Sequence, residues 1–268
     1  MSFEEFLKEV GPLLGLQWRP FQRRGVKRKV ERRLLELGLT HLGDYLFKVR
    51  NDPEERDRLS QILTVTISRF FRDREVFEAL EKTVLPSILK NKERREMKVW
   101  SIGCASGEEP YSLSILWRER FEKHYPEVRL TVLATDIRES LLERATAGIY
   151  KKSSLKEIPS PFLTSYFTDI NGSYLLDRSL RESVTFRREN ILQRDPYSGM
   201  HLVFCRNVAF TYFIKPLQVA VLKKIASSLS EEGYLVIGKE ESLPLTFPTL
   251  FVPVLPDRGI YQKFLPHP

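Results

Sequence analysis

The chain has 268 residues, of which 42% are apolar, and a formal net charge of +8. This length accommodates one sizeable α/β domain with a smaller appendage, and the apolar content is ordinary for a globular protein. No apolar run approaches the roughly 20 residues of a membrane span, and the acidic N-terminus does not resemble a signal peptide. The two cysteines, Cys104 and Cys205, indicate neither a disulfide framework nor a zinc site. We therefore expect a cytoplasmic protein that inserts into no membrane and holds no metal.

The first 75 residues have the pattern of an all-α domain. Apolar side chains recur there at the spacing of amphipathic helices, and Gly38 marks an expected helix end. The expected helices cover Phe3–Val10, Val26–Leu37, His41–Val49 and Glu54–Leu63, followed by a linking helix over Asp73–Lys90. We predict a helical domain over residues 1–75 and a second domain over residues 76–268.

Much of the positive charge lies in one segment. Arg19–Arg33 holds eight basic residues and one acid, Glu31. Such a segment is either a docking surface for an acidic partner or simply a solvated helix face. Phe21 is its one aromatic residue, which gives little support for nucleic-acid binding.

After residue 97 the pattern changes to alternating strands and helices. Strands are expected over Lys98–Ile102, Arg129–Thr135, Leu202–Cys205 and Tyr234–Gly238, and helices over Pro110–Lys123, Glu139–Thr146 and Pro216–Leu229. This alternation predicts a mostly parallel sheet with helices on both faces. The segments Leu250–Leu255 and Ile260–Phe264 predict an antiparallel C-terminal hairpin, and a small β excursion is expected near residues 165–187.

The stretch Val99–Ser112, VWSIGCASGEEPYS, reads as a strand, a glycine turn and a helix start. Gly103, Ala105 and Gly107 allow the main chain to turn tightly beside a ligand. Glu108 and Glu109 follow, although a pyrophosphate pocket would avoid carboxylates at a helix N-terminus. S-adenosylmethionine has no phosphate and carries a sulfonium and an ammonium. The stretch therefore predicts a methyltransferase, although such a turn alone also occurs without a ligand.

Two further features lie at expected strand ends. Asp136 follows the second strand, where an acid holds ribose hydroxyls in nucleotide-binding folds; its alternative role is an N-cap of the next helix. Arg206 and Asn207 end the expected fourth strand and precede an aromatic loop with Tyr212. Arg206 is either a fixed donor for a ligand or half of a structural salt bridge. Phe210 and Phe213 are best explained as core residues.

Four segments together resemble the chemotaxis-receptor methyltransferases, the CheR family of protein-glutamate O-methyltransferases. They are LTVTISRFFRD, VWSIGCASGEEPYS, ATDIRESLLERATAGIY and FCRNVAFTYF, and YLVIGKEESLP resembles a later block of the family. The resemblance covers almost the whole chain. It implies a class I S-adenosylmethionine-dependent methyltransferase, with a Rossmann-like, mostly parallel sheet and an antiparallel C-terminal hairpin, preceded by a small all-α domain.

The resemblance also implies roles for individual residues. Arg72 and Tyr212 are expected near the transferred methyl as catalytic residues. The cofactor, S-adenosyl-L-methionine, and its product S-adenosyl-L-homocysteine are expected to contact Thr66, Ser68, Arg72, Gly103, Ala105, Glu109, Asp136, Asn190, Ile191, Arg206 and Asn207. Glu109 would face the amino-acid part and Asp136 the ribose, while Asn190 and Ile191 would flank the adenine. Arg24, Lys27, Arg28 and Arg32 would dock an acidic helical protein such as a chemoreceptor.

Three departures from the family pattern indicate a divergent member. The loop after Asn207 is one residue longer than usual, so that Tyr212 is shifted along the chain. The run Lys239–Ser242 replaces a His-Ser-Glu-Asn-like run and changes the charge at the pocket rim. The β excursion looks short, as in members that do not dock a receptor's tail peptide, and we expect no such docking.

The expected chemistry needs no general base. A glutamate carboxylate has a reference pKa of about 4.3 and is ionised at neutral pH. Catalysis would then rest on alignment and electrostatics, with Arg72 orienting the incoming carboxylate. Two other classes remain open: a methyltransferase for a small molecule or another acceptor, and a non-catalytic cofactor-binding module. The absence of an Asn-Pro-Pro-Tyr motif disfavours nucleic acid.

Overall fold

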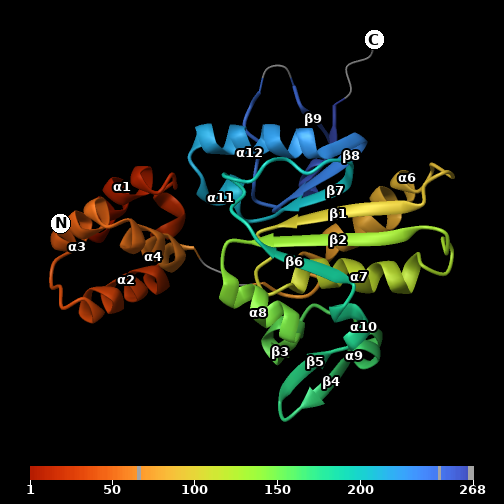
Figure 1. The fold of residues 1–268 in the computed structure, drawn as a ribbon, viewed down its shortest axis with the longest axis horizontal. Coiled ribbons are helices and arrows are strands. Elements are labelled where there is room, and N and C mark those ends of the chain that lie inside the picture. Colours follow the sequence, from red (N-terminus) through yellow and green to blue (C-terminus); the bar gives the residue numbers. More distant parts are fainter. Residues whose placement is uncertain (65–67, 247–248, 265–268) are drawn as a thin grey trace. The chain divides into compact units, whose positions relative to one another are not determined.

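The computed structural model describes residues 1–64, 68–246 and 249–264 (Figure 1). The chain forms two compact units, one made of Met1–Thr66 with Val208–Gln218 and the other of Ile67–Asn207 with Val219–Pro268. This division differs from the predicted boundary at residue 75, because the segment that carries Arg72 belongs to the second unit. The segment Val208–Gln218 joins the helical unit, which no local pattern in the sequence indicates.

The first unit is built from short amphipathic helices. They are α1 (Phe3–Leu13), the 3-10 turn η1 (Arg19–Phe21), α2 (Arg24–Glu36), α3 (Leu42–Asn51) and α4 (Pro53–Leu63). Ser2 and Glu5 form a capping box at the start of α1, and Asp52 caps α4 by accepting from two main-chain N–H groups. These helices bury a common apolar core. The four helices expected in this region are confirmed.

The core of the first unit contains a charged residue, Glu55. Its carboxylate accepts hydrogen bonds from the Arg33 guanidinium at 2.5 and 3.0 Å and from the Tyr45 hydroxyl at 2.7 Å. Since both oxygens are bonded, burial of the charge is compensated. Arg33 holds the pKa of Glu55 below its usual value.

The linking helix is interrupted by a wider turn. It consists of α5 (Arg74–Ala79), the π-helical turn η2 (Leu80–Val84) and α6 (Leu85–Ile88). The N–H of Leu85 donates to the carbonyl of Leu80, five residues earlier. Pro86 has no N–H to continue the ordinary ladder, which gives the wide turn a local cause.

The second unit is organised around a seven-stranded sheet of order β6-β2-β1-β7-β8-β10-β9. Its strands are β1 (Glu96–Ile102), β2 (Arg129–Asp136), β6 (Val184–Arg188), β7 (Met200–Cys205), β8 (Leu229–Ile237), β9 (Phe251–Leu255) and β10 (Ile260–Lys263). The four pairings from β6 to β8 are parallel, whereas β10 pairs antiparallel with both β8 and β9. This confirms the predicted parallel sheet with an antiparallel C-terminal hairpin.

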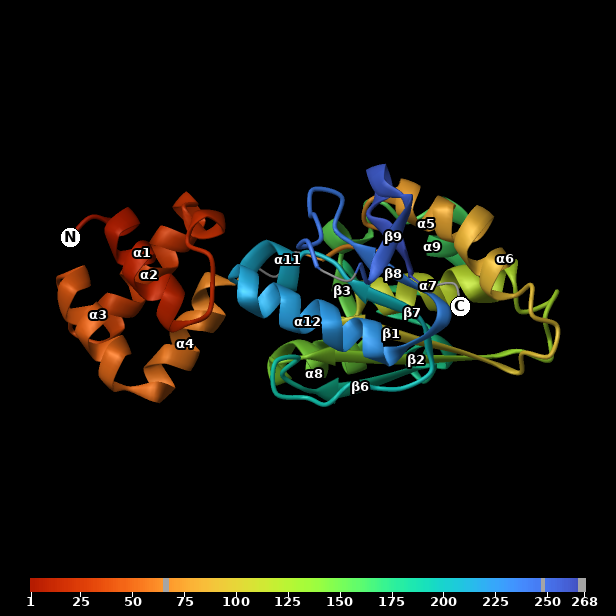
Figure 2. The same cartoon turned by 90° about the horizontal axis from the view of Figure 1, so that it is seen from above.

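Helices cover both faces of this sheet. The helix α7 (Glu108–Arg120) follows β1, and α8 (Glu139–Ala147) follows β2. The helix α12 (Lys215–Ser228) follows the short α11 (Ala209–Tyr212). Side chains such as Val99 and Phe204 share one core with α5, α6 and α7, while their neighbours Trp100 and Val203 are buried on the opposite face. Figure 2 shows α12 on the other side of the sheet from α5 and α6.

A smaller antiparallel sheet has the order β3-β5-β4, with β3 (Ile149–Lys151), β4 (Phe167–Ile170) and β5 (Ser173–Leu176). The short helical segments beside it are η3 (Lys152–Leu155), α9 (Ser160–Tyr166) and α10 (Arg178–Arg181). The β excursion expected near residues 165–187 contains β4 and β5, but β3 of the same small sheet precedes this range and β6 belongs to the main sheet. β6 is an edge strand with charged residues, and such strands lack the apolar pattern of central ones.

Candidate active site

The turn between β1 and α7 has a left-handed main chain at alternate positions. Gly103, Ala105 and Gly107 have φ values of 68°, 51° and 84°. A Cβ at Gly107 would lie 3.0 Å from three packed side chains, so this position requires glycine. The N–H groups of Gly103 and Cys104 donate to the carbonyl of Thr135 at 2.8 and 3.0 Å. The turn is therefore fixed to the carboxyl end of β2.

Asp136 shapes the same region with both of its carboxylate oxygens. Oδ2 accepts from the N–H of Ala105 and Oδ1 from the N–H of Arg138, each at 3.0 Å. The side chain is 6% exposed. Because each carboxylate oxygen has two lone pairs, these bonds leave acceptor capacity for a ligand. The alternative role of Asp136 as an N-cap is not found, because the N-cap of α8 is Arg138 and no side chain caps this helix.

The two acids after the glycine turn have different surroundings. Glu109 accepts from the Ser101 hydroxyl at 2.8 Å and from Arg206 at 3.3 Å. Burial raises its pKa, and the Arg206 guanidinium opposes that rise. Glu108 is 3% exposed, its pKa is raised by burial, and it lies 3.5 Å from the Ser154 hydroxyl. The other carboxylate oxygen of Glu108, Oε2, is buried and has no hydrogen-bond partner within the described residues.

Arg72 lies in a turn with unusual main-chain geometry. The residues on either side of it, Phe71 and Asp73, have φ values of 53° and 59°. A left-handed main chain costs an L-residue roughly 1–2 kcal/mol. The Phe71 N–H donates to the Ser112 hydroxyl at 2.8 Å, and the phenyl ring is buried. The Arg72 side chain itself is 40% exposed.

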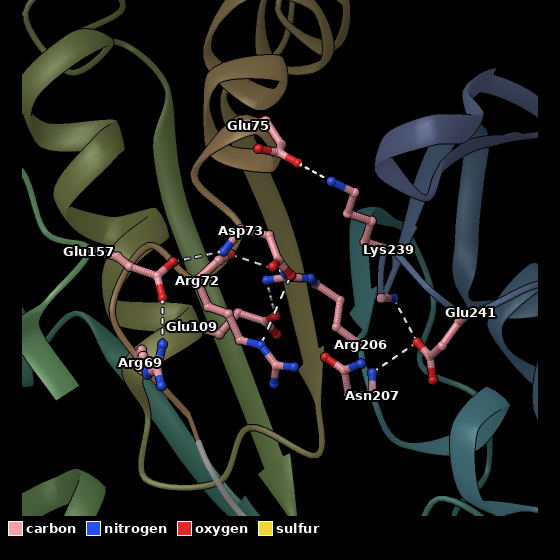
Figure 3. Close-up of polar contacts among 11 residues, drawn as sticks. Arg69, Arg72, Asp73, Glu75, Glu109, Glu157, Arg206, Asn207, Lys239 and Glu241 are labelled. Carbon is pink, nitrogen blue, oxygen red and sulfur yellow. Dashed lines mark hydrogen bonds and ion pairs between the residues drawn. The ribbon is translucent and has the colours of Figure 1, made fainter. Parts of the chain in front are cut away.

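Arg206 connects the turn around Arg72 to Glu109 (Figure 3). Its guanidinium donates to the Arg72 carbonyl at 3.1 Å, to the Asp73 carboxylate and to Glu109. With only 4% of its side chain exposed, it is a buried arginine with acids on two sides. The structural salt bridge considered from the sequence is therefore present, and it joins two parts of the expected site.

Asn207 is held by an acid from the loop after β8. Its φ is 55°, and its N–H donates to Glu241 Oε2 at 2.8 Å. The same oxygen accepts from the Gly238 N–H at 2.6 Å. The side-chain oxygen of Asn207 is buried and has no hydrogen-bond partner within residues 1–64, 68–246 and 249–264. It is an acceptor available to a bound molecule.

The expected adenine-binding pair follows β6. Asn190 comes directly after Glu189, whose N–H donates to the Asp136 carbonyl at 3.0 Å. The Asn190 side chain accepts from the N–H of Leu192 at 3.0 Å, and the Ile191 carbonyl accepts from Lys224 at 2.6 Å. The structure thus brings the pair next to the end of β2. Thr66 lies outside the described residues.

Tyr212 belongs to the first unit, whereas Arg72 belongs to the second. The Tyr212 ring stacks on Phe21, with ring centroids 5.5 Å apart and an angle of 9° between the planes. Its carbonyl accepts from the N–H of Gln17 at 2.7 Å, and the Gln17 side chain donates to the Phe213 carbonyl at 2.9 Å. The segment with Tyr212 is therefore bound into the helical unit.

The basic residues of α2 occupy its solvent side. Its apolar residues Val26, Val30 and Leu34 are buried in the helical core. The predicted docking residues Arg24, Lys27, Arg28 and Arg32 are all exposed. One of them, Lys27, lies 3.9 Å from Glu31. Leu35, at the end of the same helix, is 77% exposed.

Sequence reasoning missed Asp73, Glu157 and Glu241 as members of the site. Asp73 directly follows Arg72, and Glu241 lies after β8 in the run Lys239–Ser242, which sequence reasoning placed at the pocket rim without naming this acid. Glu157 accepts from Arg69 and from the Asp73 N–H at 3.1 Å each. No local pattern marks it.

The site provides hydrogen-bond acceptors at the carboxyl ends of three parallel strands. Glu109 follows β1, Asp136 ends β2 and Asn207 follows β7. A ligand with an ammonium, a sulfonium and ribose hydroxyls needs such acceptors, and the fold places them where α/β sheets bind nucleotides. These residues fit S-adenosylmethionine. Within the described parts of the chain no group of acidic, histidine and cysteine side chains could hold a metal.

Fold and site thus define the class of S-adenosylmethionine-dependent methyltransferases. The family model described as CheR methyltransferase, SAM binding domain, matches residues 66–257. The chain therefore belongs to the CheR methyltransferase family, and its cofactor is S-adenosylmethionine.

Several known proteins are similar over much of the chain. A chemotaxis protein methyltransferase of Listeria monocytogenes is 31% identical, covering 89% of this chain and 88% of that protein. Chemotaxis protein methyltransferase 2 of Pseudomonas aeruginosa is 29% identical, covering 90% and 86%. An uncharacterized 104.1 kDa protein of Rhodobacter capsulatus is 32% identical over 81% of this chain, but the chain spans only 23% of that protein.

Solved methyltransferase structures are similar at a lower level. The StiE O-methyltransferase domain has a TM-score of 0.37 and 18% identity, covering 71% of this chain and 50% of that one. The N-methyltransferase NodS of Bradyrhizobium japonicum, in complex with S-adenosyl-L-homocysteine, has a TM-score of 0.33 and 17% identity, covering 61% and 60%. Both similarities are weak, and the fold assignment rests on the sheet order and the family match.

Proposed function

We propose that this protein transfers the methyl group of S-adenosylmethionine to glutamate side chains of an acidic helical protein, such as the cytoplasmic domain of a chemoreceptor. The main support is the turn around Arg72, which presents a half-exposed guanidinium beside the buried pair of Arg206 and Glu109. Relatives named chemotaxis protein methyltransferases agree with this acceptor. No helix in the described parts of the chain is long and apolar enough to cross a membrane. We propose that the protein works in the cytoplasm.

The proposed reaction is an in-line displacement. The bound cofactor supplies a methyl group on a positively charged sulfur. Arg72 orients the incoming carboxylate, which is ionised at neutral pH and needs no base. Since charge is neutralised as the methyl moves, an arginine that bound the carboxylate too tightly would slow the step. The exposed position of Arg72 fits orientation better than tight binding.

Other residues hold the cofactor in this proposal. Glu109 faces the ammonium, and Arg206 favours the ionised form of Glu109 although burial opposes it. Asp136 faces the ribose, and Asn207 offers its buried side-chain oxygen. Tyr212 is proposed to orient the methyl or the carboxylate. The exposed arginines and lysine of α2 dock the acidic acceptor through charge complementarity.

The deciding experiment transfers labelled methyl from the cofactor into proteins of a cell lysate. Label that is released by mild alkali identifies carboxyl esters, whereas alkali-stable label indicates N-methylation and contradicts the proposal. A cofactor that binds in calorimetry without any transfer would indicate a non-catalytic module. Label in small molecules would assign another acceptor to the same chemistry.

The matched variants are Arg72→Ala and Arg74→Ala. Arg72→Ala should lose turnover and keep its affinity for the cofactor within about threefold, because the proposed role concerns the acceptor. Arg74 is an exposed arginine two residues further on, paired with Glu78 at 3.3 Å, and its removal should leave turnover unchanged. Turnover near the parent level in Arg72→Ala would exclude the assigned role.

A further inference from the structure

We propose that Glu157 is a positioning residue, which holds the turn Phe71–Asp73 in the shape that presents Arg72 to the acceptor. This inference rests on the proposed function, in which Arg72 orients the carboxylate. It assigns a catalytic contribution to a residue outside the motifs of the sequence.

The turn needs support from outside itself. Phe71 and Asp73 are both left-handed, and Asp73 starts α5 without a side-chain cap. Such conformations in L-residues persist only where the surrounding structure determines them, and they cluster at functional sites. Contacts that hold the two residues therefore control where Arg72 points.

Glu157 supplies such contacts before and after Arg72. Its Oε2 accepts from the N–H of Asp73, and its Oε1 accepts from the Arg69 guanidinium, both at 3.1 Å (Figure 3). One carboxylate thus binds both ends of the stretch 69–73. The bond to Asp73 acts directly on one of the left-handed residues.

The same segment of the chain braces the turn in two further ways. Glu157 lies between η3 and α9, beside the small sheet. From η3, the Ser154 carbonyl accepts from the Phe70 N–H at 2.9 Å. From α9, the Phe162 ring lies 5.7 Å from that of Phe71. In this chain the excursion that holds the small sheet therefore supports Arg72, a role that needs no bound tail peptide.

Glu157 is better suited than Arg206 to isolate this effect. Arg206 also contacts the turn, but it bonds Glu109 as well, so its removal would disturb the cofactor site. The contacts found for Glu157 involve Arg69 and Asp73. Removing its carboxylate should therefore change the placement of Arg72 while leaving Glu109, Asp136 and Asn207 in place.

The test compares Glu157→Ala and Glu157→Gln with a control, Glu78→Ala, which removes another carboxylate paired with an arginine. Turnover is measured with labelled S-adenosylmethionine and the purified cytoplasmic fragment of a bacterial chemoreceptor, and cofactor affinity by calorimetry. Glu157→Ala should lower kcat about tenfold with KM and cofactor Kd within about twofold of the parent. Glu157→Gln keeps an acceptor for the Asp73 N–H and should recover most of kcat. Glu78→Ala should match the parent.

Hydrogen exchange gives a readout that does not depend on the acceptor. The peptide covering residues 70–77 should exchange several-fold faster in Glu157→Ala, because the Asp73 amide loses its acceptor. Unchanged exchange overturns the proposal. A kcat of Glu157→Ala within about twofold of the parent, while Arg72→Ala is inactive, also overturns it but leaves the proposed function intact. A loss of cofactor affinity in Glu157→Ala that parallels its loss of kcat overturns the proposal as well. Full activity in Arg72→Ala would instead refute the proposed role of Arg72.

Discussion

Several carboxylates around the candidate site accept hydrogen bonds from main-chain N–H groups and so fix the main chain there. Asp136 accepts from the N–H groups of two turns, and Glu241 does the same for Asn207 and Gly238. Hydrogen bonds to ionised groups are stronger than neutral ones. Each acid therefore fixes the main chain at the strand ends that form the proposed cofactor site.

Glu241→Ala should weaken cofactor binding about tenfold, because Asn207 loses the acceptor that holds its left-handed main chain. Calorimetric titration with S-adenosyl-L-homocysteine measures the change without an acceptor. The neighbouring Glu240 is exposed, and Glu240→Ala is the control that should bind like the parent. Equal affinities in both variants would show that Glu241 does not support the pocket.

At this scale the sequence predicted residues that lie inside motifs. Glu109 and Asp136 are found at the strand ends where the glycine turn and the acid after the second strand predicted them. Glu157 was not predictable, because its partner Asp73 is 84 residues away and neither a repeat nor a turn links them. Contacts of this kind arise only when the chain is folded.

At the scale of elements, hydrophobic periodicity was a reliable guide to the helices and central strands. The hairpin of β9 and β10 is confirmed between the two predicted segments Leu250–Leu255 and Ile260–Phe264. The errors have local causes: Pro86 widens the linking helix, and the charged edge strand β6 lacks a central strand's apolar pattern. Three-residue strands such as β3 are too short to show any period.

The helical unit should lose stability in acid through Glu55. Arg33 lowers the pKa of Glu55 in the folded state. The ionised Glu55 therefore stabilises the fold fully at pH values above its pKa in the unfolded chain, which is about 4.3. This stabilisation is lost as the pH falls through the lower folded value. The protection factors of the amides in α3 and α4, which compare their hydrogen exchange with the intrinsic rate at each pH, should therefore decrease at pH values below that range.

Glu55→Gln is the matched variant for this effect. It should destabilise the unit by about 2–4 kcal/mol at neutral pH, because Arg33 is left without its buried partner. It should also reduce the extra acid sensitivity of α3 and α4. An unchanged pH dependence in Glu55→Gln would assign that sensitivity to other carboxylates.

At the scale of the whole molecule, the net charge of +8 has one local source in the segment around α2. Reversing Arg28 and Arg32 together to glutamate should raise KM for a chemoreceptor fragment at least about tenfold and leave kcat nearly unchanged, because the proposed docking residues are not among the proposed catalytic residues. Lys123→Glu, an exposed charge reversal in the second unit, is the control. If the double variant has the KM of the parent at low salt, α2 does not dock the acceptor and is an ordinary solvated helix.

The helical unit includes a segment that is remote in sequence, Val208–Gln218, and this segment contains Tyr212. Gln17 and Phe21 hold it by hydrogen bonds and ring stacking. The two units are therefore not modules joined at a single point, and recombination at one junction would exchange the helices without their own tyrosine segment. Tyr212 and the helices that hold it should consequently be inherited together, and engineered chimaeras need to transplant both pieces.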